Sequence, residues 1–68
     1  MAERGRIKKI LWDHERGGYF GFIERPTGDD VWFSGSVVRG LSLVPNDQVE
    51  FILAKNTARL RAAQVWRV

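Results

Sequence analysis

Apolar and polar residues alternate along several short stretches of the chain, and clusters of turn-forming residues separate these stretches. Glycine, proline, asparagine and aspartate mark the turns, most densely at 17–18, 26–30 and 45–47. The stretches between the turns are rich in β-branched and aromatic residues and follow the period of two that is typical of strands. We therefore predict an all-β protein with strands near residues 5–12, 18–24, 30–34, 47–54 and 58–67.

Five short strands in a chain of 68 residues predict an antiparallel barrel or sandwich. Unpaired strand edges are poorly tolerated in a domain this small, and a closed barrel has none. We therefore favour a barrel over a sandwich. The one long connection, residues 35–46, has room for a single helical turn at 36–38. Ser36 is placed to cap that turn.

The alternation in the second predicted strand assigns its two faces. Tyr19, Gly21 and Ile23 share one face, and the missing side chain of Gly21 suits the inside of a small, tightly twisted barrel. Phe20 and Phe22 share the other face, because successive side chains of a strand point to opposite sides. We therefore expect two phenylalanine rings on the outer surface.

The third predicted strand repeats this arrangement. If Val31 and Phe33 belong to the core, Trp32 and Ser34 lie outside, next to the two phenylalanines of the preceding strand. Three large aromatic side chains on a solvent face are costly unless something stacks on them. Nucleobases fit this role, at about 1–3 kcal/mol for each stacked base. The alternative is a reversed alternation or a covering loop, which would place the rings in the core.

Charge is distributed unevenly along the chain. The net charge is +3, but residues 1–16 carry +2, residues 59–68 carry +3, and the segment between them carries −2. Most of the aromatic residues fall between 19 and 33, so two basic segments bracket an aromatic one. This pattern suits a single-stranded nucleic acid if the fold brings the basic ends beside the rings.

Several motifs occur together in a fixed order. Residues 5–10 read GRIKKI, residues 18–23 read GYFGFI, and residues 30–38 read DVWFSGSVV. Residues 47–51 then read DQVEF, and residues 62–65 read AAQV. Taken in this order, the series resembles the cold-shock domain, the five-stranded OB-fold module that binds single-stranded RNA and DNA. The resemblance spans most of the chain.

The resemblance implies an antiparallel five-stranded OB-fold barrel, with Phe20, Phe22 and Trp32 at the stacking positions of its nucleic-acid face. It also implies that Lys8 contacts a phosphate, although each basic residue has an ordinary solvated charge as its alternative. The candidate nucleic-acid-binding residues are Lys8, Lys9, Trp12, Arg16, Phe20, Phe22, Trp32, Ser34, Arg59 and Arg61.

The chain departs from the family pattern on the expected binding face. Lys9 stands where the family has tryptophan, Ser34 where it has histidine, and Gly35 where an aromatic residue is frequent. The segment that joins the first two strands is about four residues longer than in the family. It contains Trp12, which either replaces the lost stacking tryptophan or plugs one end of the barrel. We assign Trp66 to the core or the barrel edge.

No set of residues in the sequence predicts catalysis. His14 is the only histidine and lies between two acids in a predicted loop. There is no cysteine, metal-ligand spacing or phosphate-binding glycine loop, so we expect no enzyme activity, cofactor or metal. The start of the chain lacks the apolar segment of a signal peptide and no stretch is long enough for a membrane helix, so we expect a cytoplasmic protein.

These observations predict one domain over residues 1–68 that binds single-stranded RNA or DNA with low sequence specificity. Such a protein would act as an RNA chaperone or as a regulator of transcription or translation. We expect a monomer, with a weak dimer as the alternative, and neither a membrane nor a small molecule as partner. The competing hypothesis is a protein-interaction module on a small β-barrel that has lost nucleic-acid binding.

Overall fold

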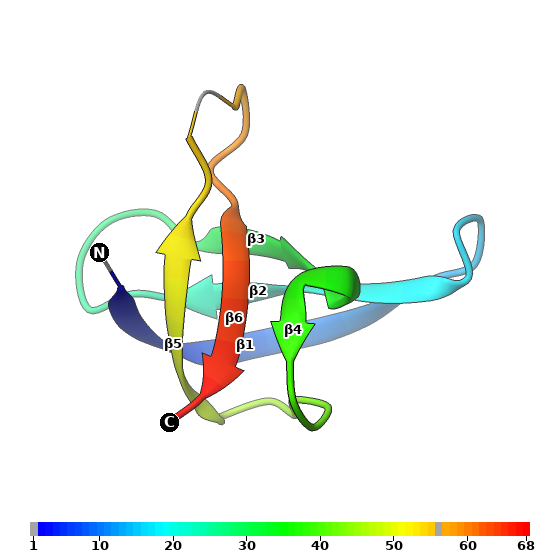
Figure 1. Ribbon diagram of the computed structural model, residues 1–68, viewed down its shortest axis with the longest axis horizontal. Coiled ribbons are helices and arrows are strands. Elements are labelled where there is room, and N and C mark those ends of the chain that lie inside the picture. Colours follow the sequence, from blue (N-terminus) through cyan, green and yellow to red (C-terminus); the bar gives the residue numbers. More distant parts are fainter. Residues whose placement is uncertain (1, 56) are drawn as a thin grey trace.

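The computed structural model describes residues 2–55 and 57–68, which form strands and one short 3₁₀ helix (Figure 1). The all-β prediction is confirmed. The elements in chain order are β1 (Glu3–Asp13), β2 (Gly18–Glu24), β3 (Val31–Ser34), η1 (Gly35–Val37), β4 (Val38–Arg39), β5 (Gln48–Leu53) and β6 (Ala62–Arg67).

The strands form one sheet in the order β3-β2-β1-β5-β6-β4. Neighbouring strands are antiparallel except β4 and β6, which are parallel. The prediction of five antiparallel strands was therefore wrong in number and in one direction, because the chain after η1 runs alongside β6 for two residues. The last strand also begins later than predicted, since residues 58–60 lie outside any strand.

The predicted closure of the barrel is incomplete. β3 and β4 are the edges of the hydrogen-bonded sheet. Near the start of β6, Trp32 of β3 forms an isolated bridge with Arg61, and its amide donates a hydrogen bond of 3.1 Å to the Leu60 carbonyl. Both partners precede β6, so in the described residues no hydrogen-bonded ladder joins β3 to β6, although the two strands are in contact.

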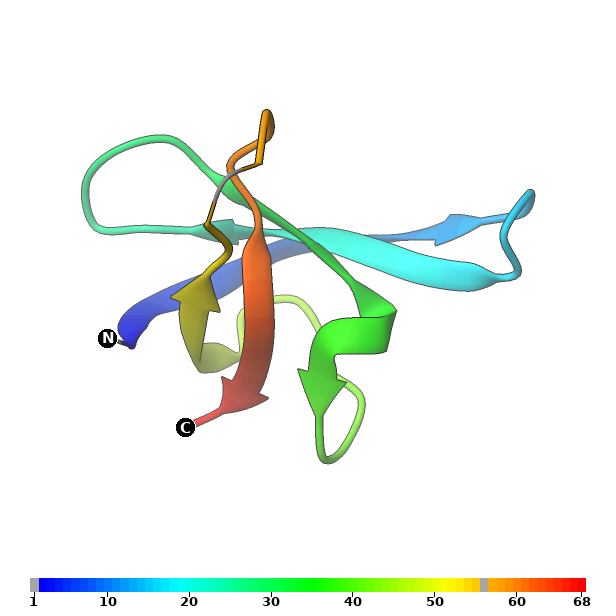
Figure 2. The ribbon, with the colours of Figure 1, turned by 45° about the horizontal axis from the view of Figure 1, so that its top comes forward.

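The core lies between two parts of the sheet that cross steeply. In Figure 2, β1, β2 and β3 lie across the view, whereas β5, β6 and β4 lie roughly upright in it. The fully buried side chains alternate along these strands and face inward from both parts. They are Ile7, Ile23, Val31, Phe33, Val49, Phe51 and Val65.

Gly21 allows β1, β2 and β3 to pack closely. A Cβ atom at this position would lie 2.6 Å from the carbonyl oxygen of Lys9 and 2.8 Å from the ring of Phe33. Only glycine leaves room for both, so the expectation that Gly21 faces inward is confirmed. The ring of Phe33 fills the space that a side chain would otherwise take.

The long connection begins with the predicted helical turn, but its cap differs from the prediction. The turn is the 3₁₀ helix η1, and the hydroxyl of Ser34 accepts a hydrogen bond from the Ser36 amide. Ser34 is therefore the N-cap and Ser36 lies inside the turn. The turn begins at Gly35, directly after Ser34 ends β3.

The hairpin of β1 and β2 extends beyond the rest of the sheet (Figures 1 and 2). β1 pairs with β5 only over Glu3–Arg6, whereas it pairs with β2 as far as Asp13. Gly17 closes the turn with a positive φ of 67°, which glycine adopts without strain. In the described residues, no helix is long and apolar enough to cross a membrane.

Candidate nucleic-acid interface

Three aromatic rings form a continuous strip on the outer face of β2 and β3. Phe22 lies directly opposite Trp32 in the antiparallel register. The ring of Phe20 is stacked with that of Trp32 at 6.3 Å between centroids, and it meets Phe22 edge to face, also at 6.3 Å. We call Phe20, Phe22 and Trp32 the aromatic strip. Each is half-buried, so the predicted alternation is confirmed and the alternative of rings in the core is wrong.

The aromatic strip is the floor of a hollow of about 700 Å³, which we call the aromatic groove. Arg16 borders it from the hairpin turn, and Arg59 and Leu60 border it from the β5–β6 connection. The fold therefore brings one arginine of each basic segment, 1–16 and 59–68, beside the rings. Four carboxylates also line the groove, namely Asp13, Glu15, Asp29 and Asp30.

Two cations lie directly against the rings of the strip. The ammonium nitrogen of Lys9 is 5.4 Å from the ring centroid of Phe22, and the guanidinium carbon of Arg59 is 5.0 Å from that of Trp32. Both distances are within the range of cation–π attraction. A base that stacks on the strip would therefore have a positive charge beside it, in a position to attract the phosphates on either side.

Lys8 differs from these two because its charge is already balanced. A register shift in β1 between Ile7 and Lys9 includes Lys8, whose ammonium donates to Asp30 at 2.9 Å. The hydrogen bond to this carboxylate, together with its negative charge, raises the pKa of Lys8 above its ordinary value. The contact of Lys8 with a phosphate stays a prediction, and it would compete with Asp30.

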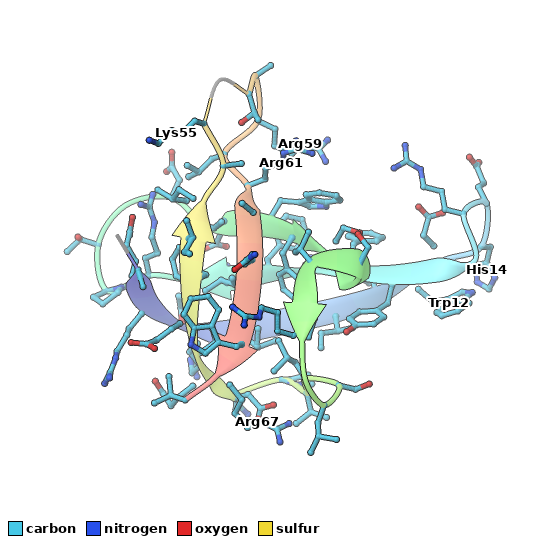
Figure 3. The ribbon with its side chains drawn as sticks, viewed as in Figure 1. Trp12, His14, Lys55, Arg59, Arg61 and Arg67 are labelled. Carbon is cyan, nitrogen blue, oxygen red and sulfur yellow. The ribbon has the colours of Figure 1, made fainter. Side chains whose placement is uncertain are left out.

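Arg16, Arg61 and Ser34 all lie near Trp32. Arg16 is in the hairpin turn with its side chain 83% exposed, and its Nε is 3.9 Å from the Asp13 carboxylate. Arg61 precedes β6, and Figure 3 shows it next to Arg59 above the start of that strand. Ser34 ends β3, and it lines a hollow together with Trp32 and Arg61. The structure therefore brings these three predicted site residues together around one ring.

Trp12 is the candidate that the structure separates from the others. It lies opposite Tyr19 in the register and therefore on the opposite face of the hairpin from Phe20. It is 57% exposed near the tip of the hairpin, where Figure 3 also places His14. Trp12 is thus neither a plug for the core nor part of the aromatic strip.

Tyr19 lies on the inward face of β2, as the alternation predicted, and packs partly buried against the core. Its ring lies against Gly35, where a Cβ atom would be 2.6 Å from the ring. The Tyr19 ring, which comes from β2, therefore occupies the space where a side chain at position 35 would lie. An aromatic residue at position 35 would collide with Tyr19.

Two features near the strip were missed from the sequence. Leu11 is 40% exposed and lies opposite Phe20 in the register, so it extends the strip along the hairpin. The acidic lining of the groove was missed because Asp13 and Glu15 are distant in sequence from Asp29. The alternation in the first strand, which places Leu11 on the same face as Lys9, was the sequence signal that could have predicted the position of Leu11.

Trp66 was expected in the core or at the barrel edge, and it lies instead on the outer face of β6. Its indole nitrogen donates to the Glu50 carboxylate at 3.0 Å, and the guanidinium of Arg39 is 5.7 Å from its ring centroid. Arg4 also donates to Glu50, at 3.1 Å. The hydrogen bonds from Arg4 and then from Trp66 lower the pKa of Glu50 below its ordinary value. This cluster lies on β1, β4, β5 and β6, away from the aromatic strip.

The sequence matches no protein-family model and no curated protein. The described part of the chain also contains no group of three or more histidine, cysteine or acidic side chains that could hold a metal ion. The interpretation of the site therefore rests on its geometry and on the motif resemblance.

Proposed function

We propose that this protein binds single-stranded RNA or DNA on the aromatic strip, with low sequence specificity, in the manner of a cold-shock domain. The observation that carries the proposal is the arrangement of Phe20, Phe22 and Trp32 as three adjacent half-exposed rings, with Lys9 and Arg59 against them. Stacked bases would cover apolar surface that otherwise faces water.

The proposal extends to the fold. We infer that the sheet is a variant of the OB-type barrel, with β4 as an addition to the five expected strands. The contact between Trp32 and Arg61 supports this interpretation, because it lies where a barrel would close. The same contact brings the β5–β6 connection, with its arginines, next to the strip.

Low specificity follows from how the rings would bind. Every base has a π-face, so stacking accepts all four bases at about 1–3 kcal/mol each. A strip that holds bases in an unstacked arrangement would also shift weak hairpins toward the single-stranded form. We therefore propose a role as an RNA chaperone or as a regulator of transcription or translation. In either role the protein would act by melting weak secondary structure in the nucleic acid.

A titration of tryptophan fluorescence with a short single-stranded oligonucleotide tests the proposal. We expect saturable binding at micromolar concentrations in low salt, with weaker binding to a duplex of the same sequence. The affinity should fall with added salt at a log–log slope of about −0.7 for each neutralised phosphate.

The same titration distinguishes the protein-interaction module. A groove that binds a peptide through apolar contacts would be far less sensitive to salt. Absence of oligonucleotide binding at micromolar concentrations in low salt would refute the proposed function.

A further inference from the structure

A second hollow, which we call the rear hollow, also borders Trp32. It has a volume of about 430 Å³ and lies between η1 and the start of β6. Trp32 and Arg16 line both hollows, so the two spaces are neighbours on the same surface. The remaining lining of the rear hollow includes Arg61, Ser34 and Ser36.

The two hollows differ in charge. Four carboxylates and two arginines line the aromatic groove, whereas the described lining of the rear hollow contains Arg16 and Arg61 and no acid. Arg61 forms no ion pair with any residue that the structure describes, and the one partner of Arg16 is the Asp13 carboxylate at 3.9 Å. Of the two spaces, the rear hollow therefore has the lining that favours an anion more.

The hydroxyl groups of Ser34 and Ser36 add a neutral donor. Their oxygens are 2.9 Å apart, and the Ser34 oxygen also accepts from the Ser36 amide. Whichever hydroxyl donates to the other, one hydroxyl hydrogen remains without an acceptor among the described residues. The rear hollow thus presents two guanidinium groups and one O–H group, which is donor chemistry suited to phosphate oxygens.

We infer that the rear hollow holds a phosphate group of the strand whose bases stack on the aromatic strip. The inference rests on the proposed function, and it adds the path of the backbone. In a nucleotide the phosphate lies beside the plane of the base, so a base stacked on Trp32 carries its phosphate toward one edge of that ring. The four carboxylates of the aromatic groove disfavour a phosphate there, whereas Arg61, which lines only the rear hollow of the two, favours a phosphate in the rear hollow.

Arg61→Gln tests the inference, with Lys55→Gln as the matched control. Each substitution removes one positive charge from the chain between β5 and β6, but Lys55 lines neither hollow. We expect Arg61→Gln to weaken binding of a short single-stranded oligonucleotide about tenfold. Its log–log salt slope should become shallower by about 0.7, the contribution of one phosphate contact.

Arg61→Lys separates the charge from the geometry. Lysine keeps the positive charge but loses the planar fork that binds two phosphate oxygens. We expect a salt slope close to that of the unmodified protein and an affinity between those of the unmodified protein and Arg61→Gln. Near-UV circular dichroism checks that each variant is folded. If Arg61→Gln does not fold, Arg16→Gln takes its place with the same expectations.

Each failure has a distinct signature. An unmodified protein that binds no oligonucleotide refutes the proposed function together with this inference. Normal binding by the unmodified protein, with Arg61→Gln and Lys55→Gln alike in affinity and salt slope, refutes only the inference.

A second probe tests whether the phosphate belongs to the strand. Inorganic phosphate should shift the Arg61 Nε–H resonance weakly and be displaced by the oligonucleotide. Saturating phosphate binding that persists beside the bound oligonucleotide would assign the hollow to a free anion and overturn the inference.

Discussion

Removing one ring of the aromatic strip separates binding from folding. Phe22→Ala deletes a ring that is half-buried on the outer face of β2, opposite Trp32 and under the ammonium of Lys9. The deleted atoms do not belong to the set of fully buried core side chains. The domain should therefore stay folded while it loses one stacking surface.

The expected loss of affinity follows from the value of one stacked base. A contribution of about 1–3 kcal/mol corresponds to a dissociation constant about 5- to 150-fold larger. Fluorescence titration with the same oligonucleotide measures this change, and urea denaturation measures the free energy of unfolding of the same sample. Phe22 lies beside Trp32, so the emission of the unbound variant provides the baseline for its own titration.

Phe33→Ala is the matched comparison. Phe33 is on the neighbouring strand and fully buried, so its removal should cost about 3–5 kcal/mol of stability. That is comparable with the whole stability that a core of this size supplies, about 3–5 kcal/mol, so this variant should unfold. The reasoning is refuted if Phe22→Ala unfolds in the same way, or if it stays folded and binds as tightly as the unmodified protein.

Three further predictions concern packing, acidity and charge. Gly21→Ala should lower the free energy of unfolding by about 1–3 kcal/mol, because its methyl group would meet a backbone carbonyl of β1 and a buried ring of β3; an unchanged denaturation midpoint in urea would contradict this. The hydrogen bond from Arg4 is the largest cause that lowers the pKa of Glu50. The ionised Glu50 carboxylate therefore stabilises the fold at pH values above its ordinary pKa, and this stabilisation is lost as the pH falls through the lowered pKa. The free energy of unfolding should therefore decrease on acidification below about pH 4.5, and less steeply in Glu50→Gln, whereas identical pH profiles would count against the contact. Asp30→Asn should strengthen oligonucleotide binding, because it removes a carboxylate from the groove and releases Lys8 from its ion pair; weaker binding in a titration would show that the pair itself is needed.

The faces of β2 and β3 were predictable from the sequence because their alternation is strong. Gly21 lies between Phe20 and Phe22, and only one of the two faces of such a strand can pack closely against a neighbour. The two faces of β3 follow in the same way from Val31 and Phe33. These positions place the aromatic strip without any knowledge of the tertiary structure.

Other features depend on contacts that no local pattern contains. β4 has two residues, too few for a period, and exists because Val38 and Arg39 lie alongside β6. Trp12 was ambiguous because the length of the β1–β2 hairpin beyond the core sets its exposure. The rear hollow likewise forms from segments that are far apart in the chain, so only the fold brings Arg16 and Arg61 to the same tryptophan.

The central claim is that bases stack on Phe20, Phe22 and Trp32, and the three tryptophan indole N–H signals in a ¹⁵N correlation spectrum test it directly. On addition of a short single-stranded oligonucleotide, the signal of Trp32 should shift progressively to saturation. The signal of Trp66, which is hydrogen-bonded to Glu50 away from the strip, should stay in place. A saturable shift of Trp66 with Trp32 unchanged, or no shift in either, would contradict the account.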